Sequence, residues 1–287
     1  MTRSNRVLKL VAGAEPEAGP ADPLWGRLRG EAIAALQADP ALDALMFHSI
    51  LGHASFESAV ADRLSVRLAT DTLPYHLLQD VFLRAFAAEP SIGEAIRADL
   101  QAVVERDPAA GRLIEPFIFF KGFAAIQTHR IAHWLWSNRR RDLALFMQSR
   151  SSEVYQTDIH PAVPIGRGIF LDHASGLVIG ETAVIEDDVS ILQNVTLGGT
   201  GTGAGDRHPK IRRGVMIGAG ARILGPVEIG AYSRIAAGSV VTQPVPAHST
   251  AVGIPARIIP HAVTLRPAQS MDQTLAGTDY DGFTYAI

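Results

Sequence analysis

An aliphatic residue recurs every six positions through much of the second half of the chain. The series shifts by two residues between Leu171 and Ile179 and is interrupted by a loop at 198–210. All thirteen of its members are Ile, Leu or Val, and they are Ile159, Ile165, Leu171, Ile179, Ile185, Ile191, Leu197, Ile211, Ile217, Ile223, Ile229, Ile235 and Val241. With about one residue in four aliphatic in an average protein, such a run is very rare by chance.

A period of six matches neither an α-helix, whose faces repeat about every 3.6 residues, nor a strand, whose faces repeat about every two. It matches a solenoid that turns a corner every six residues and points one aliphatic side chain per face inward, with coils about 4.8 Å apart. Glycine follows the aliphatic position at 166, 180, 198, 218 and 230, where a tight corner favours a residue without a Cβ. The alternative is an ordinary β-rich domain with frequent turns, but the repeat favours the solenoid.

The first half of the chain carries signals for helices. Asp22-Pro23 and Asp39-Pro40 each place an N-cap carboxylate before a proline at the first helical position. Ser91 and Glu94 form a capping-box pattern, and a further helix is predicted at about 119–140. The domains expected are therefore a flexible extension at 1–22, a helical domain at 23–150, the solenoid at 151–260 and a flexible tail at 261–287.

Composition excludes several classes of function. The 287 residues include no cysteine, which excludes disulfides, thiolate zinc sites and a cysteine nucleophile. A net charge of -3 gives no reason to expect a nucleic-acid partner. No apolar run reaches the roughly 18–20 residues needed to span a bilayer, and we expect a cytoplasmic protein.

Several motifs resemble those of the bacterial serine O-acetyltransferases, a family within the hexapeptide-repeat acyltransferase superfamily. They include Leu-Asp-His-Ala-Ser-Gly at 171–176, Gly-Asp-Arg-His-Pro-Lys-Ile at 205–211, Gly-Ile-Pro-Ala-Arg at 253–257, Glu-Arg-Asp-Pro at 105–108 and Phe-Lys-Gly-Phe at 120–123. The resemblance covers residues 25–260 approximately. It implies an α+β chain in sequence order, in which an all-α domain precedes a left-handed parallel β-helix. It also implies trimers with active sites between neighbouring β-helices, paired into hexamers through the helical domains.

The resemblance further implies that the chain transfers an acetyl group from acetyl-CoA to the hydroxyl of L-serine, with acetyl-CoA as co-substrate and no metal. His173 matches the family's general base, and Asp158 matches the carboxylate that orients it. The chemistry fits, because a neutral imidazole with a pKa near about 6.5 can take the hydroxyl proton and a carboxylate fixes its tautomer. Without the motif, His173 reads as an ordinary loop residue and Asp158 as a turn residue before Pro161.

Serine carries both an ammonium and a carboxylate, so its site needs groups of both signs. By the resemblance, Arg207 and His208 hold the carboxylate and the reacting region, while Asp107 and Asp172 receive the ammonium. Arginine suits a carboxylate because it binds in a bidentate manner. On local pattern alone, Asp107 is a helix cap and Arg207 a solvated loop residue.

The remaining candidates match the family's contacts with its other ligands. Those for acetyl-CoA are Gly199, Thr200, Ala219, Ala237 and Arg257, of which the small residues equally suit the corners of a solenoid. The C-terminal Ile287 resembles the tail that inserts into O-acetylserine sulfhydrylase. The resemblance also implies feedback inhibition by L-cysteine at the serine site.

Three other functions compete with this interpretation. A γ-type carbonic anhydrase would bind a metal through three histidines such as His160, His173 and His208, but the cationic loop around His208 disfavours a divalent ion. Another acetyltransferase would use homoserine or a sugar as acceptor, and only the motifs separate serine from homoserine. A scaffold without activity is the third. His129 and His133 have zinc-like spacing but lack the accompanying glutamate, and we expect packing or surface roles.

Overall fold

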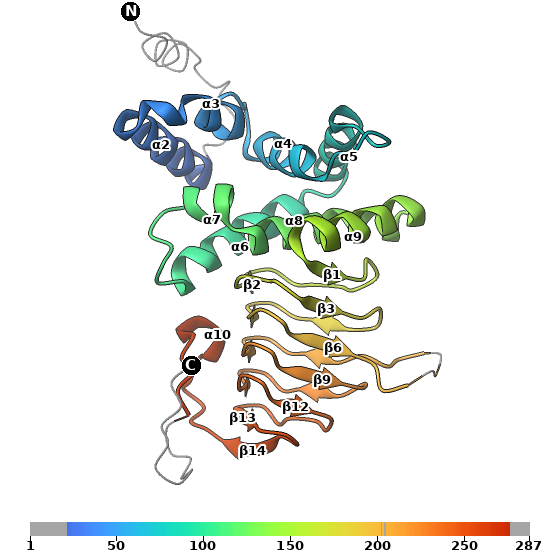
Figure 1. Cartoon of the computed structure of the whole chain (residues 1–287). Coiled ribbons are helices and arrows are strands. Elements are labelled where there is room, and N and C mark those ends of the chain that lie inside the picture. The colour runs from blue at the N-terminus through green and yellow to red at the C-terminus, as the bar shows by residue number, and fades with distance from the viewer. Residues whose placement is uncertain (1–21, 202, 204, 276–287) are drawn as a thin grey trace, which may run out of the picture.

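The computed structural model describes residues 22–201, 203 and 205–275, in which a helical domain lies across one end of a β-helix (Figure 1). The helices are α2 (Pro23–Ala38), α3 (Asp43–Met46), α4 (Phe56–Leu68), α5 (Tyr75–Ala88), α6 (Ser91–Arg106), α7 (Ile114–Phe119), α8 (Lys121–Ser137), α9 (Arg141–Tyr155) and α10 (Pro267–Ser270), with the 3₁₀ turn η1 (Pro40–Leu42) and the π turn η2 (Phe47–Leu51). Residues 1–21 of the extension predicted at 1–22, and the last residues, 276–287, lie outside the described part.

The helix starts follow from their caps, with one exception. The Asp22 carboxylate accepts hydrogen bonds from the backbone N–H of Leu24 and Trp25, and so caps α2 as predicted. Asp39 caps η1 in the same way. The predicted capping box at Ser91 is wrong. Pro90 already has helical torsion angles, so Ser91 lies inside the first turn, and its hydroxyl donates to Glu89 at 2.6 Å.

The β-helix is built from short parallel strands in three sheets. The five-stranded sheet contains β1 (Thr157–Ile159), β3 (Leu177–Ile179), β6 (Thr196–Gly198), β9 (Arg222–Leu224) and β12 (Val240–Val241). The three-stranded sheet contains β4 (Val184–Ile185), β7 (Lys210–Ile211) and β10 (Glu228–Ile229). The six-stranded sheet contains β2 (Phe170–Leu171), β5 (Ser190–Ile191), β8 (Met216–Ile217), β11 (Arg234–Ile235), β13 (Ser249–Val252) and β14 (Arg257–Pro260). All pairs are parallel except β13 with β14.

Each coil passes once through all three sheets, as the six-residue period predicts. Ile217 lies beside Ile235 in the next coil, a separation of three repeats. The members of the aliphatic series point inward and are buried, apart from the half-buried Ile165 in the first coil. The solenoid interpretation is therefore confirmed, and a helical domain followed by a parallel β-helix matches the predicted fold class.

The two interruptions of the repeat are located at different corners of the solenoid. The two-residue shift is absorbed by His173 and Ala174, whose φ angles of 54° and 60° are both positive. Few non-glycine residues adopt this left-handed conformation. The longer insertion extends the connection between β6 and β7 into a loop that projects from the side of the β-helix (Figure 1). Both interruptions carry candidate site residues.

Buried polar side chains fasten the helical domain to the first coil. Asp99 on α6 pairs with Arg130 on α8 at 2.7 Å and accepts a hydrogen bond from the backbone N–H of Ile169. His129 and His133 on α8 donate ring N–H bonds to the carbonyl oxygens of Val163 and Pro161, at 3.0 and 2.9 Å. The two histidines thus join the domains, a more specific role than the packing or surface position expected from their spacing.

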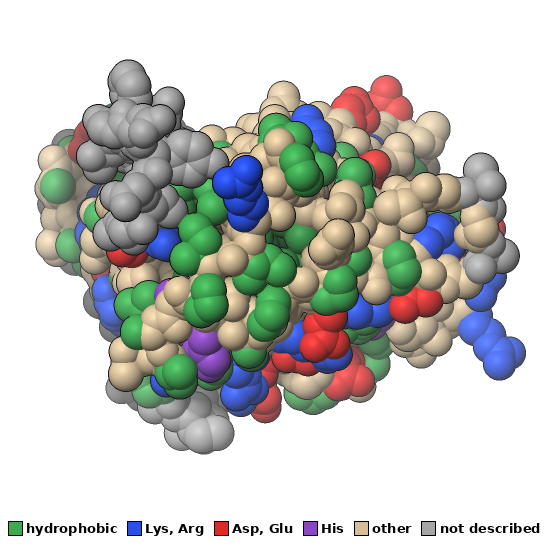
Figure 2. All heavy atoms as spheres, turned by 90° about the horizontal axis from the view of Figure 1, so that it is seen from below, with side chains coloured by type: hydrophobic (Ala, Val, Ile, Leu, Met, Phe, Trp, Pro, Cys, Tyr) green, Lys and Arg blue, Asp and Glu red, His purple; other side chains and the backbone are tan. Residues whose placement is uncertain are grey.

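The far end of the β-helix is closed by the β13–β14 hairpin. Apolar side chains gather on this end (Figure 2), and those exposed there include Ile254, Ile258 and Ile259. The segment expected to be a flexible tail then returns along the six-stranded sheet. Its short helix α10 buries Pro267 and Ala268, and the carbonyl oxygen of Ala268 accepts a hydrogen bond from the Ser190 hydroxyl. The first part of this segment is therefore packed against the domain.

Candidate active site

His173 lies at the corner that joins the six-stranded sheet to the five-stranded sheet. We call this the His173 corner, and in successive coils it comprises residues 172–176, 192–195, 218–221 and 236–239. The imidazole is 74% exposed, and its Nε2 lies 3.8 Å from a carboxylate oxygen of Asp172. With this exposure to solvent among the described residues, the ring is open to a ligand or to a neighbouring molecule.

Two carboxylates approach each other beside His173. Asp107 follows α6, where its carboxylate accepts a hydrogen bond from the backbone N–H of Ala109. Burial raises the pKa of Asp172, and the nearby Asp107 carboxylate raises it further, whereas His173 opposes the change. Like charges at close range favour a bound cation. The structure therefore brings together three of the predicted residues, in an arrangement suited to an ammonium group.

Ala219 and Ala237 occupy the same corner as His173 in later coils. Backbone hydrogen bonds connect the levels, from Asn194 N–H to the Ser175 carbonyl, from Gly220 N–H to Gln193, and from Gly238 N–H to Ala219, at 2.7–2.9 Å. The small side chains thus form a column that leads away from His173 along the β-helix. A long ligand lying on this column could approach the backbone closely.

Arg207, His208, Gly199 and Thr200 lie at a different corner, between the five-stranded and three-stranded sheets. We call it the His208 corner, and it comprises residues 160–164, 180–183, 199–201 and 205–209. Arg207 forms an ion pair with Glu181 at 2.5 Å, and this hydrogen bond lowers the pKa of Glu181. Lys210, the first residue of β7, adds an ammonium that donates to the Thr182 carbonyl oxygen at 2.6 Å and forms an ion pair with Asp206 at 2.5 Å, so Arg207 and Lys210 each have a carboxylate partner here.

The protonation state of His208 follows from its neighbours. The backbone N–H and the hydroxyl of Thr182 lie 3.2 and 2.8 Å from Nδ1. Since a backbone N–H can only donate, Nδ1 accepts, and the proton of the neutral ring is on Nε2. Burial, followed by the charges of Arg207 and Lys210, lowers the pKa of His208. His208 therefore presents a neutral N–H donor.

Asp158 lies on β1, between the two corners. In register it is beside Val178 of the next coil, and its carboxylate accepts a hydrogen bond from the Gln148 side chain at 2.7 Å. Within the described residues, no hydrogen bond or ion pair joins Asp158 to His173. The chain comes close nearby, because the hydroxyl of Thr157, the preceding residue, donates to the Ala174 carbonyl oxygen at 3.2 Å.

Two glycines support these corners, although sequence reasoning did not assign them to the site. A Cβ on Gly180 would lie 2.0 Å from Nε2 of His208, and a Cβ on Gly122 would lie 2.0 Å from the carbonyl oxygen of Leu171. Gly180 follows an aliphatic position of the repeat, so its pattern indicated only a corner. Gly122 stands in the Phe-Lys-Gly-Phe motif, which was the one available signal for it.

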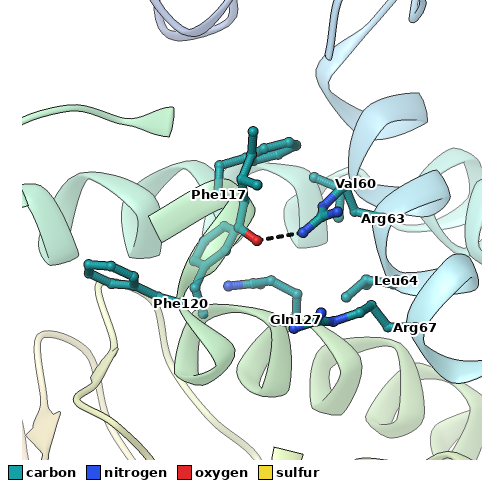
Figure 3. A pocket seen from close by; sticks show the side chains of 10 residues that line it. Val60, Arg63, Leu64, Arg67, Phe117, Phe120 and Gln127 are labelled. Atoms are coloured by element: carbon teal, nitrogen blue, oxygen red, sulfur yellow. Dashed lines mark hydrogen bonds between the residues drawn. The ribbon is translucent and has the colours of Figure 1, made fainter. Parts of the chain in front are cut away.

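Among the small pockets of the described residues, one of about 30 Å³ lies at the His173 corner, where Gly218, Ala236 and Ala237 line it together with Gln273 and Leu275, and the others lie elsewhere. One is lined by α4, α7 and α8, where Arg63 donates to the Ile118 carbonyl oxygen (Figure 3). Its volume of about 20 Å³ holds at most a water molecule. A wider cleft at the domain junction is lined by His129, Arg130 and His133 and contains none of the predicted site residues. Apart from Ala237, none of the predicted site residues lines one of these pockets.

The remaining candidate residues are Arg257, Ile287 and the histidines considered as metal ligands. Arg257 lies on the exposed strand β14, which begins one residue after Ala256, whose N–H donates to the Val240 carbonyl oxygen, and Ile287 is outside the described residues. His160 and His208 share a corner, whereas His173 lies at the other, so the three do not converge within one chain. In the described ranges, no three His, Cys, Asp or Glu side chains are placed to bind a metal, and no described helix has the length and apolar character of a bilayer-spanning segment.

Comparisons with known proteins agree with the motifs. The model of the serine acetyltransferase N-terminal domain matches residues 24–128, and the bacterial transferase hexapeptide model matches residues 208–243. The serine acetyltransferase of Salmonella typhimurium is 50% identical over 254 residues, which are 88% of this chain and 93% of that protein. The crystal structure of the Vibrio cholerae serine acetyltransferase superposes with a TM-score of 0.87 at 49% identity, covering 88% of this chain and 98% of the other.

Similar solved structures include ligand complexes. A serine acetyltransferase in complex with cysteine has a TM-score of 0.86 at 47% identity, covering 87% and 97% of the two chains. The Brucella abortus serine acetyltransferase in complex with coenzyme A has a TM-score of 0.83 at 52% identity, covering 84% and 97%. The soybean serine acetyltransferase complexed with serine has a TM-score of 0.81 at 49% identity, covering 84% and 100%. The chain belongs to the serine acetyltransferase family.

Proposed function

We propose that this chain transfers the acetyl group of acetyl-CoA to the hydroxyl of L-serine, giving O-acetyl-L-serine and CoA for cysteine biosynthesis. The observation that supports this most is the division of charge between the two corners. Asp107 and Asp172 place two carboxylates at the His173 corner, and the guanidinium of Arg207 lies at the His208 corner beside its partner Glu181. A zwitterionic acceptor needs both.

The complete site is proposed to form between two subunits of a trimer. In a cyclic trimer each interface is heterologous, so one corner of a chain meets a different corner of the next. The His173 corner of one subunit would then face the His208 corner of its neighbour. This pairing brings Arg207 to the carboxylates of Asp107 and Asp172 and covers the exposed His173 imidazole. A dimer of such trimers through the helical domains gives the proposed hexamer.

His173 acts as the general base. It takes the hydroxyl proton as the serine oxygen adds to the thioester carbonyl carbon, and the tetrahedral intermediate collapses with release of the CoA thiolate, which recovers the proton from the imidazolium. Asp158 is assigned to orient the ring and stabilise its charged form, which requires the exposed His173 side chain to turn toward β1. The reaction passes through no acyl-enzyme.

The other residues bind the substrates. Arg207 holds the serine carboxylate, His208 donates from Nε2 to the reacting region, and Asp107 with Asp172 accepts the ammonium. Acetyl-CoA lies along the column of Ala219 and Ala237, against Gly199 and Thr200 of the adjacent subunit. Arg257 is assigned to the CoA phosphates. No step needs a metal.

Three further properties are proposed with this function. L-cysteine, which shares the amino and carboxyl groups of serine, competes for the same site. The C-terminal Ile287 inserts into O-acetylserine sulfhydrylase. The enzyme acts in the cytoplasm, where a chain without cysteine needs no disulfides.

The acceptor is tested by measuring free CoA released from acetyl-CoA in the presence of L-serine, L-homoserine or a sugar. We expect L-serine to give at least about tenfold higher kcat/KM than L-homoserine, because one extra methylene in a fitted site costs about 1–3 kcal/mol, and the sugar to give none. A preference for L-homoserine or for the sugar would replace serine as the acceptor.

A further inference from the structure

The beginning of α8 presses against the loop that carries His173. Gly122, in its first turn, approaches the Leu171 carbonyl oxygen so closely that any Cβ would overlap it. The preceding residue, Lys121, is therefore fixed directly above residues 172–176. Its side chain is half-buried.

The ammonium of Lys121 reaches two groups of this loop region. It donates to the hydroxyl of Ser175 and, at 3.3 Å, to the side-chain oxygen of Gln156, the residue between α9 and β1. Among the hydrogen bonds of the described residues, the bond to Ser175 is the one that joins a side chain of the helical domain to residues 172–176. Lys121 thus bridges the helical domain, the domain junction and the loop.

Backbone hydrogen bonds to other parts of the chain hold residues 174–176, which follow His173 in this loop. The Ala174 carbonyl accepts from Thr157, the Ser175 carbonyl from Asn194, and the Gly176 N–H donates to Gln156. His173 itself is two residues before Ser175, in a left-handed conformation that a non-glycine residue rarely adopts. Its ring position therefore depends on how firmly the following residues are held.

We infer that Lys121 is a positioning residue for His173, acting through Ser175 across the boundary between the two domains. This inference rests on the proposed function of His173 as general base. Small displacements of a catalytic group lower the rate steeply, whereas the substrate-binding Asp172 in the same loop is held separately, because its backbone N–H donates to the Ile191 carbonyl oxygen at 2.9 Å. Loss of the Lys121 bond should therefore lower kcat and leave the KM values nearly unchanged.

The experiment compares Lys121→Met, Lys121→Arg, Ser175→Ala and the double variant Lys121→Met/Ser175→Ala in the full-length enzyme. Lys121→Met keeps the aliphatic stem and removes the charge. We expect kcat to fall about 10- to 100-fold, with the KM values for L-serine and acetyl-CoA within about threefold of wild type. Arg at 121 should restore kcat to within about threefold, and the double variant should be no slower than the slower single variant.

Two controls separate this role from general damage. Arg84→Met removes a cation from an exposed ion pair with Asp80 on α5 and should leave kcat unchanged. Circular dichroism and the oligomer mass of Lys121→Met should equal those of wild type. If that variant fails to fold, Ser175→Ala alone must show the same fall in kcat at constant KM.

His173→Ala, assayed in parallel, separates the two ideas. Lys121 has no positioning role, and the proposed base stands, if His173→Ala is inactive but Lys121→Met retains wild-type kcat. The same conclusion follows if the fold-decrease in kcat of the double variant equals the product of the decreases of the two single variants. If His173→Ala is as active as wild type, the proposed base and the inference about Lys121 are both wrong.

Discussion

At the scale of single residues, His208 depends on the absence of a side chain at position 180. The imidazole packs over Gly180, and Thr182 from the same turn accepts hydrogen bonds from the backbone N–H groups of Arg207 and His208 at 3.0 and 3.1 Å. The turn after β3 therefore orients both residues that are proposed to hold the serine carboxylate and the reacting region.

We expect Gly180→Ala to lower kcat/KM for L-serine by about tenfold or more, because the new methyl group displaces the His208 ring from its position. Steady-state assays of CoA release measure the change. Gly30→Ala on α2 is the matched control, since a Cβ there meets open space, and it should behave as wild type. Wild-type kinetics for Gly180→Ala would mean that the position of His208 is unimportant.

The motifs predicted the candidate site residues better than they predicted the residues that position them. Asp172, His173, Arg207 and His208 stand in short sequence stretches that carry the resemblance. The partners that position them come from other coils or from the helical domain, as Lys121 does for Ser175. Sequence spacing gives no information about such contacts, because they depend on how the elements pack.

At the scale of elements, the junction between α8 and the first coil buries a histidine. Burial, and then the charge of His133, lowers the pKa of His129 to about 3. The ring is therefore neutral in the folded protein at pH values where it would be protonated in the unfolded chain. Its contribution to stability is complete above the ordinary histidine pKa and is lost as the pH falls toward about 3.

This predicts how the free energy of unfolding changes with pH. One such group lowers it by about 1.4 kcal/mol per pH unit below pH 6.5. Wild type should therefore lose about 2–3 kcal/mol more than His129→Gln between about pH 6.5 and pH 4.5. Glutamine keeps a donor for the Val163 carbonyl oxygen without titrating. Denaturant titrations at both pH values measure the difference, and equal losses would show that His129 is not held neutral.

The repeat made the β-helix predictable, because each inward position must be aliphatic whatever the rest of the coil contains. Helix starts were predictable only where the cap was local. Asp22 satisfied this condition, and Ser91 failed it because Pro90 had already begun the helix. The packing of α10 against the six-stranded sheet gave no periodic signal, since only Pro267 and Ala268 are buried in it.

At the scale of the whole molecule, the predicted site is divided between two corners of one chain. The His173 corner, with Asp107 and Asp172, and the His208 corner, with Arg207, lie on opposite edges of the five-stranded sheet. The repeat did not indicate which residues lie at which corner, because it describes the chain along its length, whereas the resemblance implied only that the sites lie between neighbouring β-helices. The division explains why a single chain presents an exposed His173.

The central claim is that these two corners complete each other between subunits. It is tested by co-expressing His173→Ala subunits with His208→Ala subunits and measuring serine-dependent CoA release by the mixed trimers. Each variant alone should be inactive, and random mixing should restore about a quarter of wild-type activity, because sites with one intact corner from each subunit form at some interfaces. Mixing His173→Ala with Asp107→Asn, which alter the same corner, should restore none. Mixed trimers that remain as inactive as the separate variants would contradict the shared site.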